Sequence, residues 1–127
     1  MQEKHLFEYA VIRVVPRVER EEFINVGVVL FCKKHKFLRV LYTVNAQRLQ
    51  AFCSDIDPAE ILNYLQGFEK ICLGDAHAGA IAQLDIANRF RWLTANRSTV
   101  LQTSKVHPGF CTEPQQKLEQ LFRDLVG

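Results

Sequence analysis

A basic segment in the second half of the chain holds the residues best suited to binding chemistry. No Asp or Glu occurs between Asp85 and Glu113. Guanidinium forks and hydroxyl groups are the donors that hold phosphate or carboxylate groups in proteins. The segment supplies both, and Trp92 adds a surface on which a base or an arginine can stack. The candidate ligand-binding residues are Arg89, Arg91, Arg97, Ser98, Thr99 and His107.

If an anion binds here, the three arginines should contribute unequally to its affinity. Arg97 is expected to matter most, because the hydroxyls of Ser98 and Thr99 follow it directly. Arg89 and Arg91 would share a face on a strand but diverge by about 200° on a helix. We therefore expect one of these two to point towards Arg97.

The basic residues also have a structural interpretation, which we favour over anion binding. Surface arginines often pair with carboxylates of the same chain or contact a partner protein. The acidic middle of the chain offers Asp55, Asp57, Glu60 and Glu69 for such pairing.

Asn25 and Gly27 interrupt an otherwise apolar run. A glycine inside a strand often marks a bulge or the close approach of another segment or a ligand. An asparagine beside it can satisfy backbone groups or contact a ligand. We favour a structural role for both residues.

Metal and catalytic patterns are weak. Cys32 with His35, and His107 with Cys111, could supply four zinc ligands, but neither spacing matches a zinc finger, and we predict no metal site. Glycine-rich phosphate loops, dinucleotide fingerprints and nucleophile-elbow motifs are absent from the sequence. Ser98 or Cys111 with His107 would make only a minimal nucleophile–base pair. We assign no catalytic residue and no cofactor.

The elements that must position these residues begin with a sheet. Runs rich in β-branched and aromatic residues occur at 7–15, 24–32 and 37–44, and a short polar loop at 33–36 has hairpin length. A fourth segment of strand character, 98–103, is expected to join the sheet or lie close by. Residues 107–109 (His-Pro-Gly) are predicted to form a turn.

Helices are predicted in the remaining segments. Asn45 can cap a short helix, and Asp57 before Pro58 marks the start of a longer one that ends at Gly74. Its apolar face is expected in the core. Further helices are predicted at 81–93 and at the C-terminus. The apolar positions of the longer helix are Ile61, Leu65, Phe68 and Cys72.

This order of signals predicts one α+β domain over residues 1–127. We expect an antiparallel β-meander of three or four strands with helices packed on one face. The longest apolar run is seven residues and the net charge is only +2, so neither a membrane nor a polyanion is implied by the whole chain. Scattered cysteines and the lack of a signal-peptide pattern predict a cytoplasmic protein with free thiols.

Two stretches resemble the signatures of a known family. The first covers residues 9–30 (YAVIRVVPRVEREEFINVGVVL), and the second covers residues 89–100 (RFRWLTANRSTV) and VHPG at 106–109. Together they resemble bacterial proteins catalogued as domain of unknown function 3037. The resemblance implies no activity and no catalytic residues. Genes of that family often lie beside one for a HipA-like kinase, which implies an accessory role by association.

Three classes of function remain open. The first is an accessory or interaction protein, a partner or regulator of a HipA-like kinase. The alternative is a binding module for a phosphate-bearing ligand, a nucleotide or nucleic acid, through the basic segment 89–107, or a small enzyme using His107.

Overall fold

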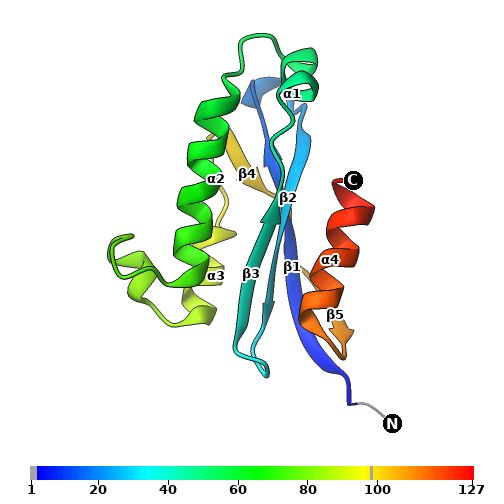
Figure 1. Cartoon of the computed structure of the whole chain (residues 1–127), viewed down its shortest axis with the longest axis vertical. Helices are drawn as coiled ribbons and strands as arrows, with labels where there is room; N and C mark the ends of the chain where they lie inside the picture. The colour runs from blue at the N-terminus through cyan, green and yellow to red at the C-terminus, as the bar shows by residue number, and fades with distance from the viewer. Residues whose placement is uncertain (1–2, 98) are drawn as a thin grey trace.

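The computed structural model describes residues 3–97 and 99–127 and is built on one antiparallel sheet (Figure 1). β1 (His5–Val14) is its central strand. β2 (Ile24–Cys32) pairs with one side of β1, and β3 (Phe37–Tyr42) pairs with the outer side of β2. β4 (Leu101–Thr103) and β5 (His107–Cys111) both pair with the other side of β1.

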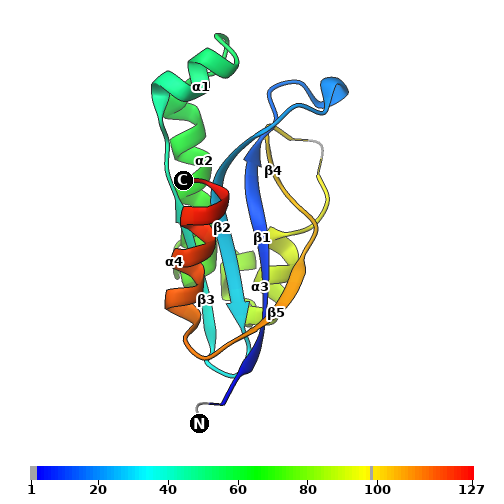
Figure 2. The same ribbon diagram turned by 90° about the vertical axis from the view of Figure 1, so that its right-hand side faces the viewer.

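Helices cover both faces of this sheet (Figures 1 and 2). One face carries three α-helices and the other carries the C-terminal helix. Two short 3-10 helices lie in the connections. The elements are α1 (Ala46–Phe52), α2 (Pro58–Leu73) and α3 (Ile86–Leu93) on one face, α4 (Pro114–Leu125) on the other, and the 3-10 helices η1 (Val18–Arg20) and η2 (Ile81–Gln83).

The predicted α+β class and antiparallel sheet are confirmed, and two details of the prediction are wrong. The sheet has five strands rather than three or four, because residues 107–109, predicted as a turn, belong to β5. The helices also lie on both faces rather than one. Eight of the nine residues of β2 are buried, so the strand needs a cover on each side, and α4 supplies the second.

The core consists of two apolar clusters separated by the sheet. The larger lies under α1, α2 and α3, and the smaller lies under α4 around Phe7 and Leu118. The predicted core positions of α2 are all buried. Phe90 of α3 stacks on Phe31 of β2, with ring centroids 5.3 Å apart, which fixes α3 on the sheet. None of the helices in the described part of the chain is long and apolar enough to cross a membrane.

The helix ends follow local capping rules. Asp57 accepts a hydrogen bond from the Ala59 backbone, and Gly74 ends α2 in the left-handed conformation (φ 68°). The predicted helix at 81–93 is instead split into η2 and α3. Asp85 is extended (ψ 164°) and its carboxylate accepts a hydrogen bond from the Asn88 backbone at 2.8 Å, so a new helix starts there.

A bulge in β2 explains the interruption of its apolar run. Ile12 pairs with Gly27 while Arg13 pairs with Asn25, so Val26 is an extra residue. Gly27 lies against β3, where a Cβ atom would approach the Leu41 carbonyl oxygen to 2.7 Å. The side chain of Asn25 donates to the Leu125 carbonyl at the end of α4 (3.1 Å).

Two glycine substitutions should therefore change stability in opposite directions. Gly27→Ala is expected to lower the free energy of unfolding by about 1–3 kcal/mol, because β3 leaves no room for a methyl group. Gly67→Ala, in the middle of α2, should raise it by about 0.5–1 kcal/mol, since nothing lies within 4 Å of the added atom. Urea unfolding measures both, and equal stability of the two variants would contradict this packing.

Candidate functional site

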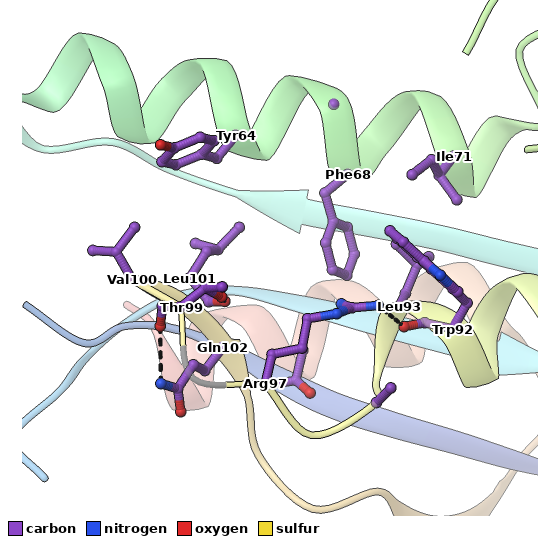
Figure 3. Close-up of a pocket in the computed structure, with 13 residues that line it drawn as sticks. Tyr64, Phe68, Ile71, Trp92, Leu93, Arg97, Thr99, Val100, Leu101 and Gln102 are labelled. Carbon is purple, nitrogen blue, oxygen red and sulfur yellow. Dashed lines mark hydrogen bonds between the residues drawn. The ribbon is translucent and has the colours of Figure 1, made fainter. Parts of the chain in front are cut away.

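A pocket of about 580 Å³ opens between α2, the C-terminal end of α3 and β4 (Figure 3). Its volume falls within the range of small-molecule sites. The walls are mainly aromatic and aliphatic, and they bring α2 together with α3 and β4, which lie later in the sequence. The large apolar side chains of the lining are Tyr64, Phe68 and Ile71 of α2, Trp92 and Leu93 of α3, Leu101 of β4, and Val100 just before it.

Arg97 brings the pocket its charge. Its side chain extends towards Trp92, and the guanidinium carbon lies 4.1 Å from the centroid of the indole ring (Figure 3). The same guanidinium donates a hydrogen bond to the Trp92 backbone carbonyl. Stacking and this bond hold the cation on one wall of an apolar cavity, where its remaining N–H groups can meet an anionic ligand.

Neutral polar side chains order the loop that carries Arg97. The Thr99 hydroxyl donates to the Leu101 carbonyl (2.7 Å), and the Gln102 amide donates to the Thr99 carbonyl (2.8 Å). At the other end of the loop, the Thr94 hydroxyl donates to the Phe90 carbonyl at the end of α3 (2.8 Å). The loop is thus held at both ends by bonds that its own sequence supplies.

The side chain of Arg89, a residue of α3, lies against the C-terminal end of α2 and does not line the pocket that contains Arg97. Its guanidinium donates to the Leu84 carbonyl at 2.8 Å. It also packs so closely on Gly74 that a Cβ there would lie 3.0 Å from one of its nitrogens. Positive charge beside the C-terminus of a helix is favourable because the helix dipole is negative at that end. Arg89 therefore joins α3 to α2 and the loop after it.

Arg91 points elsewhere again. It is exposed on α3 and lines a separate groove with Leu6 and Lys33. The expectation that one of Arg89 and Arg91 points towards Arg97 is therefore wrong. α3 is helical, so the two diverge around its axis, and Arg97 follows only after the helix has ended.

The other predicted residues are distributed over both faces of the sheet. Thr99 lines the pocket, and Ser98 lies outside the described residues. His107 is exposed on β5, opposite Tyr9, with their ring centroids 5.3 Å apart. Tyr9 belongs to the cluster under α4, so His107 is on the sheet face opposite the pocket. Cys111 is buried four residues further along β5, about 13 Å away at the usual rise of a strand.

The cysteine–histidine pairs considered for zinc have other contacts. Cys32 is buried, and its thiol donates to the Leu6 carbonyl (3.4 Å). His35 lies at the β2–β3 hairpin, with its ring 4.7 Å from that of His5. No cluster of three metal-binding side chains occurs within residues 3–97 and 99–127.

Sequence reasoning missed the α2 wall of the pocket. Tyr64 and Ile71 lie at helical spacing on either side of Phe68, a predicted core residue that also lines the pocket. The apolar face of α2 is wider than the stripe that packs on the sheet. This extra apolar surface is the sequence signal that could have indicated the pocket.

The fold is that of a small α+β protein, and Arg97 is the one charged residue in the described lining of its aromatic pocket. The family model described as protein of unknown function (DUF3037) matches residues 9–126. The chain belongs to this family, as its two signature stretches predicted. No curated protein and no solved structure matches the chain.

Cys72, buried in α2 behind the pocket, should be unreactive in the folded protein. Burial raises the pKa of its thiol to about 12, although the nearby Arg89 guanidinium lowers it. Iodoacetamide at about pH 8 should therefore leave Cys72 unmodified until urea is added, whereas the partly exposed Cys53 should react in the native state. Peptide mass spectrometry reads both sites, and equal native rates would contradict this prediction.

The same shift makes stability depend on alkaline pH. An unfolded Cys72 loses its proton near its ordinary pKa of 9.0, whereas the folded thiol keeps it up to about 12. Ionisation thus favours the unfolded state, and the contribution of Cys72 to the free energy of unfolding should fall as the pH rises from about 9 to 12. Cys72→Ala should make the alkaline decline shallower in thermal unfolding, and an unchanged slope would contradict the shift.

Proposed function

We propose that this protein is a binding module for a planar molecule that carries an anionic group, with a nucleotide as the first candidate. One observation carries the proposal: the Arg97 guanidinium is held on the face of Trp92 at the wall of an apolar pocket. A flat ring would enter between the aromatic and aliphatic walls, and its phosphate or carboxylate would meet Arg97.

The binding free energy of such a ligand would have two main contributions, one from the aromatic walls and one from Arg97. Stacking a base on an aromatic side chain contributes about 1–3 kcal/mol and tolerates different bases. A charge-assisted hydrogen bond to a guanidinium contributes about 1.5–3 kcal/mol. Thr99 and Gln102 supply neutral groups that can orient the ligand. These are groups that bind, which supports a binding role rather than covalent or proton-transfer chemistry.

Trp92 provides a direct test because it is the only tryptophan in the chain. AMP should change its fluorescence in a saturable way, and adenosine should bind less tightly because it lacks the phosphate. Arg97→Ala should weaken AMP binding by roughly tenfold and make it similar to that of adenosine. Added salt should weaken AMP binding to the wild type more than to Arg97→Ala.

Arg91→Ala is the matched control, since it removes an exposed arginine of the same segment that does not line the pocket. It should bind AMP like the wild type. Circular dichroism checks the fold of each variant, and Arg97→Lys preserves the charge if the alanine variant unfolds. Equal affinity of the wild type and Arg97→Ala for AMP would refute the role of Arg97. If neither AMP nor adenosine binds the folded wild type at millimolar concentration, the nucleotide proposal fails.

An accessory role beside a HipA-like kinase is the second candidate function. It is supported by an exposed apolar pair on the sheet, Leu6 and Phe110, which is the kind of surface that protein partners cover. Co-purification of the two tagged proteins, followed by mixing of the purified components, tests this role directly. If the purified proteins do not associate, the HipA-like kinase is not the partner.

A further inference from the structure

Leu6 of β1 and Phe110 of β5 form a solvent-exposed apolar pair on one face of the sheet. They are direct neighbours in the register of β1 and β5, and their exposed fractions are 53% and 67%. Phe110 is the most exposed large hydrophobic residue in the described part of the chain. Large apolar side chains that lie together in water are typical of surfaces that bind another molecule.

The pair is exposed because no helix covers this end of the sheet on the face that carries α3. Side chains alternate along a strand, so Phe7 and Cys111 face α4 and are buried, whereas Leu6 and Phe110 face the side of α3. α3 approaches only far enough to border a groove of about 660 Å³. Leu6 and Phe31 line this groove on the sheet side, and Ala87 of α3 lines the opposite wall. Phe110 is not one of the lining residues; it lies beside Leu6 at the edge of the groove.

The rim of the groove is basic. Lys33 and Lys34 come from the β2–β3 hairpin and Arg91 comes from α3, while Glu8 is the one carboxylate of the described lining. All three cations are exposed. Within the described residues, no carboxylate lies within 4.0 Å of any of them. The groove therefore combines an apolar floor with cations that have no ion-pair partner in the described part of the chain, although Arg91 donates a hydrogen bond to the Asn88 side chain (3.5 Å).

We propose that this groove docks an acidic amphipathic helix of a partner protein. The apolar side of the helix would cover Leu6 and Phe110, and its carboxylates would meet Lys33, Lys34 and Arg91. Charge complementarity of this kind guides the encounter and fixes the orientation of the bound segment. A helix lying along a groove with apolar anchors every three or four residues is a recurrent mode of recognition.

Two observations favour a helix over other occupants. An added strand would pair with the outer edge of β5, but Pro108 in that strand has no N–H to donate. A nucleic acid has no aliphatic side chains with which to cover Leu6 and Phe31 on the sheet side of the groove, whereas the apolar face of a helix has them. The groove is also separate from the Trp92 pocket, with no lining residue in common, so either proposal can fail alone.

Peptides of about 18 residues, or five helical turns, provide the probe. One carries leucines along one face and glutamates elsewhere, a second has lysine in place of each glutamate, and a third is a scramble of the acidic peptide. Titration calorimetry with the full-length protein should detect the acidic peptide at micromolar to submillimolar concentration and the other two much more weakly. Binding should weaken as salt is added.

The double variant Phe110→Ser, Lys34→Glu should lower affinity for the acidic peptide at least tenfold. Its matched control is Leu73→Ser, Lys105→Glu, which changes another exposed large hydrophobic residue (53% exposed) and an exposed lysine away from the groove and should bind normally. AMP-induced change in Trp92 fluorescence reports separately on the pocket. If both proposals hold, the groove variant keeps its AMP response while it loses the peptide.

Several results would overturn the proposal. The acidic peptide could fail to bind at about 1 mM, bind no better than its scramble, or bind equally to the groove and control variants. A single-stranded oligonucleotide that displaces the peptide and is lost in the groove variant would assign the surface to nucleic acid. A wild-type dimer in analytical ultracentrifugation that Phe110→Ser dissociates would assign it to a second copy of the chain.

Discussion

The sheet of this protein contains a strand, β2, that is apolar on both faces, and each face must be covered before the strand is stable in water. α1, α2 and α3 cover one face, and α4 covers the other. Two hydrogen bonds hold the C-terminal end of α4. Asn25 of β2 donates to the Leu125 carbonyl, and Arg48 of α1 donates to the Val126 carbonyl. The helices on both faces of the sheet thus depend on the same central strands.

This two-sided cover also determines where binding surfaces can lie. α3 is a short helix fixed on β2 through Phe90 and Phe31, and it is too short to cover the whole sheet face. One cavity forms at its C-terminal end, where α2 and β4 supply the other walls. A second groove forms beside its N-terminal part, where Leu6 and Phe110 remain exposed.

The division of the basic segment follows from the same geometry. Arg89 and Arg91 leave α3 in different directions, one towards the end of α2 and the other towards the groove. Arg97 lies on the loop beyond the helix and stacks on Trp92, and His107 follows on the opposite face of the sheet. The basic residues that lie close together in the sequence are therefore distributed over different surfaces of the folded protein.

The sequence determined what depends on neighbouring residues: the antiparallel strands, the Asp57 and Gly74 caps of α2, and the strand interruption at Asn25 and Gly27. It also offered Trp92 as a surface on which an arginine could stack, and in the structure Arg97 stacks on it. Only the tertiary structure decided that α4 crosses to the second face, that β5 replaces a turn, and that Tyr64 and Ile71 line a pocket. These features arise from pairing and packing between segments far apart in the chain, where the need to cover both sides of β2 overrides local preference.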